Sequence, residues 1–391
     1  MRDAFTPHQP IDSLDFFFGR QREVQNIVEQ INTPGQHSLL YGERGVGKSS
    51  LANVASKLLL RLLVGKLYVT RCDSKSSFAS LLRQPLLDVG IEIDVQGTDT
   101  TTRVGGRAGV RLPFAEATAG GDRSTTKTRM GPGSSVSPSS AAEALSDVQA
   151  LLLVDEADAI RDSEDRSRLA EFVKLLSDFR AKFKVLIVGV STTGGDLVAG
   201  HPSVSRCLRE THLGRMPDDE LSLVLTEGAR VVELEFESPA IRSIVYLSAG
   251  YPHFTHLLGL KCAEDAIAEG YSKISVRNLK TAMESAVRDA EGTLVRTYKQ
   301  ATRSHSTDMY GIILLAAANL DKPEFTARDL RESLYRLTGQ DFLQNTLNNY
   351  YQRLVSDGSA TILCRAAKGI YRFNDPRMPS YIKIAHGAID S

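Results

Sequence analysis

Gly42-Glu43-Arg44-Gly45-Val46-Gly47-Lys48-Ser49-Ser50 is the most informative stretch of this 391-residue sequence. It follows a short apolar run at residues 36–41 and precedes residues 49–63, where leucine, valine and alanine recur at helical spacing. A strand, a glycine-rich turn and a helix in this order are the context in which the pattern G-x-x-x-x-G-K-[ST] binds phosphate. The stretch therefore predicts a loop that holds a nucleotide triphosphate.

Each residue type in this loop has a physical reason to be there. Glycine lacks a Cβ, so its neighbouring N–H groups can turn toward an anion, and the following helix adds its N-terminal dipole. We expect Lys48 to reach the β- and γ-phosphates and the Ser49 hydroxyl to ligate Mg²⁺. The expected ligands are thus ATP and Mg²⁺. The loop residues predicted to contact ATP are Gly42, Glu43, Arg44, Gly45, Val46, Gly47, Lys48, Ser49 and Ser50.

A second motif ends another apolar run, Leu151-Leu152-Leu153-Val154-Asp155-Glu156. Carboxylates at the end of a parallel strand emerge at the carboxyl edge of the sheet, where ligands of such sheets bind. We expect Asp155 to hold magnesium through water and Glu156 to polarise the attacking water, because phosphoryl transfer depends on orienting the nucleophile and neutralising charge. The alternative is a charged strand end without a catalytic role.

A third polar group follows the apolar run at residues 185–190. Ser191-Thr192-Thr193 comes directly after it, and we select Ser191 as the hydroxyl that senses the γ-phosphate or holds the water. Capping of a helix explains the same residue equally well.

Alternating apolar runs and helical patterns over residues 1–216 predict an α/β fold, a doubly wound parallel sheet of the P-loop NTPase type. Residues 217–302 show amphipathic helices only, which predicts a second, helical domain; the family resemblance described below implies that it is a lid domain. In residues 303–391, three helical patterns precede a hairpin-like segment with Lys368-Gly369, which predicts a winged helix.

Residues 96–140 are rich in Gly, Thr, Ser and Arg, and we expect a mobile insertion there. Residues 101–137 carry six basic and two acidic side chains, a balance of +4. A solvated disordered loop explains this composition, and a contact with nucleic acid or a protein partner is the alternative.

Composition excludes several classes of protein. Basic and acidic side chains both number 47, so no whole-molecule field favours nucleic acid or membranes. The four cysteines are widely spaced without a C-x-x-C pair, which argues against a disulfide framework or zinc site. With 42% hydrophobic residues, no apolar signal core and no long uninterrupted apolar segment, we expect a soluble cytoplasmic protein with no membrane association.

Together these elements resemble the AAA+ superfamily, particularly initiator-type ATPases of the origin-recognition class and related bacterial AAA-family ATPases with a C-terminal winged helix. The resemblance implies ATP hydrolysis and self-association into an oligomer. Phe17-Phe18-Gly19-Arg20-Gln21-Arg22-Glu23 resembles the entry motif of this class, which implies that Phe18, Gly19 and Arg20 lie near adenine.

The segment His201-Pro202-Ser203-Val204-Ser205-Arg206-Cys207-Leu208-Arg209 resembles the part of the family that carries an arginine finger. Arg206 is the best match and Arg209 the second. Such a finger acts on the γ-phosphate of a neighbouring subunit, so it requires assembly. An ordinary surface ion pair is the alternative.

Gly250-Tyr251-Pro252-His253 lies where the initiators begin their sensor helix, commonly with arginine at the position of His253. A largely neutral histidine implies weaker or pH-dependent coupling between the lid and the γ-phosphate. The Gly-x-Pro triplet is similar to that of the STAND class of signalling ATPases, where it borders adenine. Pro252 and His253 are therefore candidate nucleotide contacts.

The sequence of the predicted winged helix is compatible with either DNA or a protein as its partner. A stripe of Leu343, Leu347, Tyr350 and Leu354 makes one helix amphipathic, so its other face could enter a major groove. Residues 303–391 have eleven basic and nine acidic side chains, a balance of only +2. DNA binding, with Arg365, Lys368 and Arg372 of the hairpin as phosphate contacts, and docking of a protein partner both remain open.

Three functions follow from these patterns. The first is an oligomerising ATPase switch that binds DNA and loads or regulates a partner machine. The second is a STAND-like signalling ATPase that holds ATP as a latch and docks a protein on its winged helix. The third, a helicase, is suggested by Asp155-Glu156-Ala157-Asp158, but residues after 216 show no second RecA-like sheet.

Overall fold

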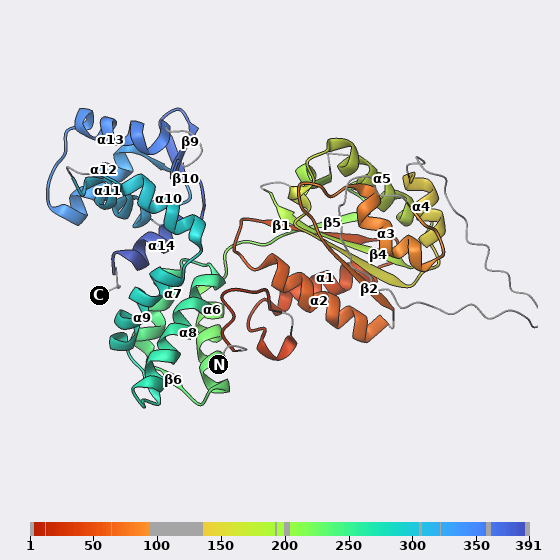
Figure 1. The fold of residues 1–391 in the computed structure, drawn as a ribbon, viewed down its shortest axis with the longest axis horizontal. Helices are drawn as coiled ribbons and strands as arrows, with labels where there is room; N and C mark the ends of the chain where they lie inside the picture. Colours follow the sequence, from red (N-terminus) through yellow and green to blue (C-terminus); the bar gives the residue numbers. More distant parts are fainter. Residues whose placement is uncertain are drawn as a thin grey trace, which may run out of the picture. The chain divides into compact units, whose positions relative to one another are not determined.

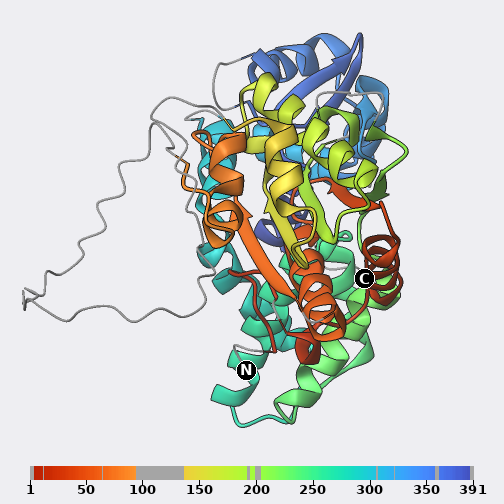
Figure 2. The same cartoon turned by 90° about the vertical axis from the view of Figure 1, so that its right-hand side faces the viewer.

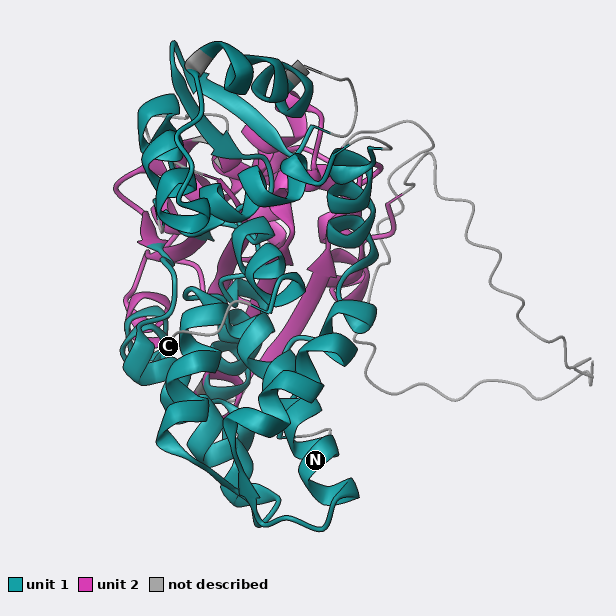
Figure 3. Cartoon of the chain, turned by 90° about the vertical axis from the view of Figure 1, so that its left-hand side faces the viewer, with its two compact units in different colours: residues 1–27, 41–58, 212–391 teal, residues 28–40, 59–211 magenta. Residues whose placement is uncertain are grey.

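The computed structural model describes residues 4–11, 13–63, 65–93, 136–191, 194–198, 204–304, 307–320, 322–356 and 361–387. The chain divides into two compact units, which Figure 3 shows in two colours. Unit 1 comprises residues 1–27, 41–58 and 212–391, and unit 2 comprises residues 28–40 and 59–211. The boundary crosses β1, so the phosphate loop belongs to unit 1 and the Asp155-Glu156 pair to unit 2.

A five-stranded sheet with the order β2-β3-β4-β1-β5 is the centre of the α/β part of the chain (Figure 1). β2 pairs in parallel with β3, and β3 in parallel with β4. The predicted α/β class with a central parallel sheet is confirmed. The strands are β1 (His37–Gly42), β2 (Lys66–Arg71), β3 (Ala150–Asp155), β4 (Phe183–Val190) and β5 (Leu208–His212).

Burial explains why the inner strands read as continuous apolar runs. Every residue of β3 is buried, and β4 is buried except at Lys184 and Val190, because parallel sheets are covered on both faces. Helices α3 (Phe78–Asp88), α4 (Pro138–Leu145) and α5 (Ser163–Asp178) pack together and cover one face of this part of the sheet (Figures 1 and 2). Their core includes edge-to-face contacts of Phe172 with Phe78 and with Phe183.

Two elements of unit 2 differ from the expectation. β5 is an edge strand with mostly exposed side chains, so it lacks the apolar run that revealed the other strands. The predicted insertion at 96–140 lies largely outside the described residues, but its last part is not irregular. Ser137 caps the N terminus of α4, and Pro138 occupies the first turn.

Unit 1 contains the helices that follow the sheet. They are α6 (Asp218–Val231), α7 (Ser238–Ser248), α8 (Pro252–Ala268), α9 (Val276–Asp289) and α10 (Gly292–Thr302). The first four of these helices are separated by residues 232–237, 249–251 and 269–275. Strands β6 (Glu235–Phe236) and β7 (Lys273–Ile274) form a parallel pair that is too short to show in the sequence.

The C-terminal part contains three helices and a small antiparallel sheet of order β8-β10-β9. The helices are α11 (Met309–Ala318), α12 (Ala327–Thr338) and α13 (Gln344–Ser356), and the strands are β8 (Phe325–Thr326), β9 (Leu363–Ala367) and β10 (Ile370–Phe373). The expected stripe on α13 is corrected at two positions. Leu343 precedes the helix and is 75% exposed, and Tyr350 is only half-buried. The buried residues are Leu347, Tyr351 and Leu354.

A last helix, α14 (Met378–Ala385), was not predicted from the sequence. It packs against α7, α9 and α11, and the Ser380 hydroxyl donates a hydrogen bond to the Ser248 carbonyl at 3.1 Å. The buried Lys383 lies over the Tyr246 ring at 4.1 Å. The eight-residue helix thus joins the C-terminal part of unit 1 to the helices of the expected lid.

The N-terminal segment is held within unit 1 by one aromatic side chain. Phe5 is 1% exposed and lies where a Cβ on Gly228 or on Gly259 would come within 2.7 Å of its ring. The two glycines therefore leave the space that the phenyl ring occupies. After this segment come the short helix η1 (Leu14–Phe16) and α1 (Gln21–Asn32).

Candidate functional site

The phosphate loop has the backbone that the sequence predicts. β1 ends at Gly42 and α2 (Lys48–Leu63) begins at Lys48. Gly45 and Gly47 have φ values of 86° and 96°, a region in which a side chain would be strained. The Lys48 ammonium is buried and donates to the Gly42 carbonyl at 3.1 Å and the Glu43 carbonyl at 2.7 Å. These features fit an anion cradle with one cation at its helical end.

The loop residue Glu43 contacts Tyr251, which directly precedes α8 in the expected lid, and Arg215. Its Oε2 accepts a hydrogen bond from the Tyr251 hydroxyl at 2.8 Å and lies 3.5 Å from Arg215 Nε. Arg215 also lies 4.9 Å from the centre of the Tyr251 ring. Burial raises the pKa of the Tyr251 hydroxyl, and the nearby Glu43 carboxylate adds to the rise, so this group stays a hydrogen-bond donor. The sequence pattern treats Glu43 as a variable position, yet its side chain joins the loop to α8.

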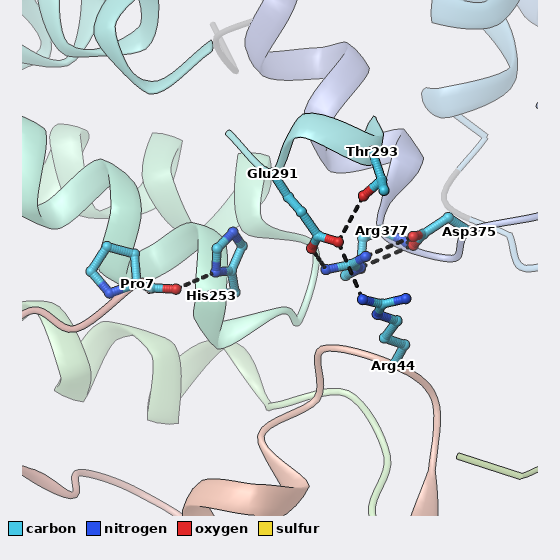
Figure 4. Close-up of polar contacts among 7 residues, drawn as sticks. All are labelled: Pro7, Arg44, His253, Glu291, Thr293, Asp375 and Arg377. Atoms are coloured by element: carbon cyan, nitrogen blue, oxygen red, sulfur yellow. Dashed lines mark hydrogen bonds and ion pairs between the residues drawn. The ribbon is translucent and has the colours of Figure 1, made fainter. Parts of the chain in front are cut away.

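The next loop residue, Arg44, bonds to Glu291 at the start of α10, and Glu291 in turn pairs with Arg377 of the C-terminal part (Figure 4). Arg44 Nη2 donates to Glu291 Oε1 at 3.2 Å, and Glu291 Oε2 accepts from Arg377 Nη1 at 2.5 Å. Arg377 forms two further bonds to Asp375, at 3.0 and 2.7 Å. A Cβ on Gly45 would lie only 2.5 Å from Arg377 Cδ. The Arg377 side chain therefore packs directly on the phosphate loop.

The charges of this cluster change the acidity of Glu291. Burial alone would raise its pKa, but hydrogen bonds from Arg377 and Thr293 and the charges of Arg377 and Arg44 lower it to about 2. Glu291 is therefore ionised throughout the neutral range and pairs with both arginines. We call Arg44, Glu291, Asp375 and Arg377 the arginine cluster.

The candidate nucleotide contacts on α8 differ in their surroundings. Pro252 begins the helix, and its Cγ lies 4.0 Å from the Cβ position of Gly47, beside the phosphate loop. His253 Nδ1 lies 2.8 Å from the Pro7 carbonyl oxygen, as Figure 4 shows. Burial lowers the pKa of His253, so the ring is neutral near pH 7 and can donate to that carbonyl. In this structure His253 contacts the N-terminal segment.

The entry motif anchors the chain before α1. Arg20 is 5% exposed and has a φ of 59°, and its guanidinium donates to the Gly214 carbonyl at 2.7 Å and to Glu23 Oε1 at 2.8 Å. Gly19 is buried, with Glu220 packed against its Cβ position, and Phe18 is half-buried. Arg20 and Gly19 therefore serve the local fold of unit 1, and their predicted proximity to adenine stays a prediction.

The acid pair lies in unit 2 at the carboxyl end of β3. Asp155 is 4% exposed, and its carbonyl accepts from the Cys72 N–H at 2.8 Å. Glu156 is exposed and has a φ of 58°, an uncommon value for a residue with a side chain. Its N–H donates to Asp155 Oδ1 at 3.0 Å. Ser191 is half-buried and follows directly after β4, the strand that neighbours β3.

Arg206 pairs within its own unit. Its Nη2 lies 3.3 Å from Asp178 Oδ1, and the arginine side chain is 71% exposed. An exposed pair of this kind contributes little to stability and can exchange partners readily. Arg209 lies in β5 and is also exposed. Thr192, Thr193 and residues 201–203 lie outside the described residues.

Several residues that contact the loop were missed at the level of the sequence. Arg215 and Tyr251 follow no motif beyond the Gly-x-Pro triplet, and nothing in the sequence pairs Glu291 with Arg377. The one available signal is Asp375-Pro376-Arg377, which ends the hairpin with a turn and opposite charges.

Comparison with known proteins identifies the family of this chain. A family model described as Novel STAND NTPase 1 matches residues 4–259, well over half of the chain. The chain belongs to this family. The matched region of this novel STAND NTPase includes the N-terminal segment, the phosphate loop, the acid pair and the first part of α8. Among curated proteins, none matches the chain.

Solved structures resemble this STAND NTPase along nearly its full length. The Aeropyrum pernix ORC2 protein, solved as ADPNP-ADP complexes, has 15% identity and a TM-score of 0.51, covering 99% of this chain and 96% of its own. Cdc6p from Pyrobaculum aerophilum has 13% identity and a TM-score of 0.49, with coverages of 100% and 99%. The fold matches the P-loop NTPase fold of that ORC2 protein, and the family model identifies the chain as a STAND NTPase. In the described part, no helix is long and apolar enough to cross a bilayer.

Proposed function

We propose that the chain is an ATP-hydrolysing molecular switch that self-associates and binds DNA to load or regulate a partner machine. The phosphate loop carries this proposal, because its left-handed glycines and the buried Lys48 at the start of α2 form a cradle for phosphate within an NTPase family. ATP and Mg²⁺ supply the transferable phosphoryl group and the neutralising metal charge.

Different residues have separate roles in the proposed hydrolysis. Lys48 neutralises charge on the phosphates, and Ser49 and Asp155 provide oxygen ligands of the kind that Mg²⁺ takes. Glu156 orients the attacking water and takes its proton, while Ser191 holds the water or senses the γ-phosphate. The exposed Arg206 acts as a finger toward a neighbouring copy, having only a solvent-exposed pair to give up.

The contacts of Glu43 and Arg44 support a switch. Glu43 accepts from Tyr251, which precedes α8, and the adjacent Arg44 pairs with Glu291 at the start of α10. A change in loop conformation on nucleotide binding would therefore be transmitted to both parts of unit 1. The neutral, buried His253 argues against its replacing a sensor arginine.

DNA binding is proposed for the hairpin of the C-terminal part. Arg365, Lys368 and Arg372 are exposed on β9, β10 and their turn, where phosphates can reach them. The order of three helices and a hairpin supports a winged helix. Because the net charge of this part is small, any affinity must depend on these few cations and fall with salt.

The first experiment tests nucleotide binding and turnover. Lys48→Ala should abolish the calorimetric signal of Mg-ATP, while Lys57→Ala, on the exposed side of the same helix, should leave it intact. Glu156→Gln should retain bound ATP and lose turnover. Normal turnover in Glu156→Gln would refute its role as catalytic base.

The second experiment tests assembly and DNA. Gel filtration should show an Mg-ATP-dependent oligomer, and Arg206→Ala should lower turnover in that assembly. Fluorescence anisotropy should show binding to duplex DNA, and the double variant Arg365→Ala/Lys368→Ala should weaken it. The slope of log K against log salt concentration should fall by about one to two in that variant. Arg328→Ala/Arg336→Ala removes two exposed cations from α12 and should have little effect. Equal losses in both double variants would contradict recognition through the hairpin.

The alternative is a STAND-like signalling ATPase in which ATP serves as a latch and the C-terminal part docks a protein. The match to a STAND family model favours it, as does the pairing of Arg206 within its own unit. Under this alternative, Glu156→Gln changes little, turnover is slow and DNA retention is absent. A pull-down with the Mg-ATP-bound chain then identifies the partner.

A further inference from the structure

Asp158 forms a bond that connects the acid-pair segment to the next strand. It lies in η2 (Ala157–Ala159), two residues after Glu156. Its Oδ1 accepts a hydrogen bond from the backbone N–H of Val190 at 2.7 Å. Val190 is the last residue of β4, and Ser191 follows it. The carboxylate thus ties the segment that carries Glu156 to the backbone that carries Ser191.

The backbone ladder between β3 and β4 does not reach this point. Its last paired residues are Val154 and Ile187, three positions before Val190. Beyond that pair, the ladder no longer fixes the end of β4 to the end of β3, although β1 borders β4 on its other side. Asp158 provides such a contact, and its charge makes the hydrogen bond stronger than a neutral one.

Gly189 leaves room for this contact. A Cβ at that position would lie 3.1 Å from Asp158 Oδ1 and 2.8 Å from Leu197 Cδ2. A side chain at residue 189 would therefore press against both the carboxylate and the buried leucine. The absence of one allows Asp158 to approach the end of β4.

The Asp158–Val190 hydrogen bond holds the turn that contains Glu156. Glu156 has left-handed backbone angles, its N–H donates to Asp155 Oδ1, and its carbonyl accepts from the Ala159 N–H at 2.9 Å. The turn is thus closed around Glu156, and Asp158 fixes that turn to β4. A carboxylate and a hydroxyl that act on one water must keep their separation within a fraction of an ångström.

We propose that Asp158 is a positioning residue for hydrolysis, which sets Ser191 relative to Glu156. This inference rests on the proposed ATPase function. Asp158 and Val190 are both exposed, so their hydrogen bond contributes little to folding, and its loss should leave the chain folded. The effect should appear in the chemical step and in the local motion of the end of β4.

The experiment compares three variants of the full chain. Asp158→Ala removes the acceptor, and Asp158→Asn keeps an amide oxygen that can still accept from Val190. Asp162→Ala is the matched control, because Asp162 Oδ1 accepts a backbone N–H from Glu164 at 2.8 Å but caps α5 instead of binding β4. For each variant, kcat and KM for ATP are measured, together with amide hydrogen exchange of the segment containing Val190 in nucleotide-free protein.

We expect Asp158→Ala to lower kcat by about ten- to hundredfold with KM changed by less than about threefold. Exchange of the Val190 segment should become faster. Asp158→Asn should restore most of the kcat and the protection from exchange, and Asp162→Ala should resemble the wild type in both. If Asp158→Ala does not fold, Gly189→Ala crowds the same contact and should lower kcat with faster exchange.

Two outcomes would overturn the inference alone. In a wild-type chain that hydrolyses ATP, an unchanged kcat with faster exchange would make Asp158 a structural residue only. Unchanged amide hydrogen exchange of the Val190 segment would mean that the bond to Asp158 does not hold the end of β4. A wild-type chain that binds ATP without turnover would overturn the proposed hydrolysis, and the positioning role with it.

Discussion

Arg377 offers the sharpest test of how the C-terminal part is held on the phosphate loop. Its side chain is 5% exposed and binds two carboxylates, Glu291 and Asp375. Arg377→Met keeps most of the length and apolar contact but leaves both acids without their main partner. Removing one member of a buried charge cluster costs about 3–5 kcal/mol, and we expect a loss of that order.

Glu291→Gln should cost less, because the amide oxygen can still accept from Arg377. The ordinary glutamate pKa of 4.5 and the value of about 2 in the cluster differ by the equivalent of about 3 kcal/mol. Since the Glu291 side chain is 30% exposed, solvent screens part of this interaction energy. We therefore expect Glu291→Gln to lower the free energy of unfolding by about 1–2 kcal/mol. The double variant should lose less than the sum of the single losses, because both remove the same pair.

The contribution of Glu291 to the free energy of unfolding changes with pH in a direction that its lowered pKa determines. A carboxyl group whose pKa is lowered by folding stabilises the folded state fully above its ordinary pKa. For Glu291, that contribution should be intact above about pH 5 and disappear as the pH falls toward 2. The stability difference between wild type and Glu291→Gln should therefore shrink over this range.

The assay is urea unfolding followed by far-ultraviolet circular dichroism, because the chain contains no tryptophan. The matched control is Arg328→Met/Glu332→Gln, an ion pair on α12 whose side chains are 88% and 57% exposed, which should change stability by less than about 0.5 kcal/mol. Equal effects of the buried and exposed pairs, or strictly additive losses for Arg377 and Glu291, would refute the reasoning.

Three other predictions concern the N-terminal segment and the start of α8. Gly259→Ala should cost about 1–3 kcal/mol by thermal unfolding, because its Cβ would lie 2.7 Å from the Phe5 ring; a Phe5→Ala background should relieve the cost, and a loss that persists there would contradict it. Calorimetric affinity for Mg-ATP should show no step at the ordinary histidine pKa of 6.5, because burial lowers the pKa of His253; a titration step near 6.5 would show otherwise. Tyr251→Phe removes the donor to Glu43 and should cost about 1 kcal/mol in thermal unfolding, with no loss expected if that hydrogen bond is absent.

Short-range patterns in the sequence were sufficient for much of the α/β region. β3 and β4 are recognisable because strands covered on both faces must be apolar throughout. α2 follows directly from its periodicity after the phosphate loop. β5 was not recognisable, since an exposed edge strand needs no apolar face. α14 was missed because eight residues show too little periodicity to distinguish a helix.

The sequence by itself determined the chemistry of the loop, because glycine, lysine and serine at fixed spacing act through their own backbone and the adjacent helix terminus. Only the tertiary structure showed that Arg44 reaches Glu291, 247 positions away, and that Arg377 packs on Gly45. Likewise, the hydrogen bond from Val190 to Asp158 depends on which strands are neighbours. Local motifs encode the groups that bind a ligand, whereas partners distant in the chain meet only when burial of the apolar core brings their elements together.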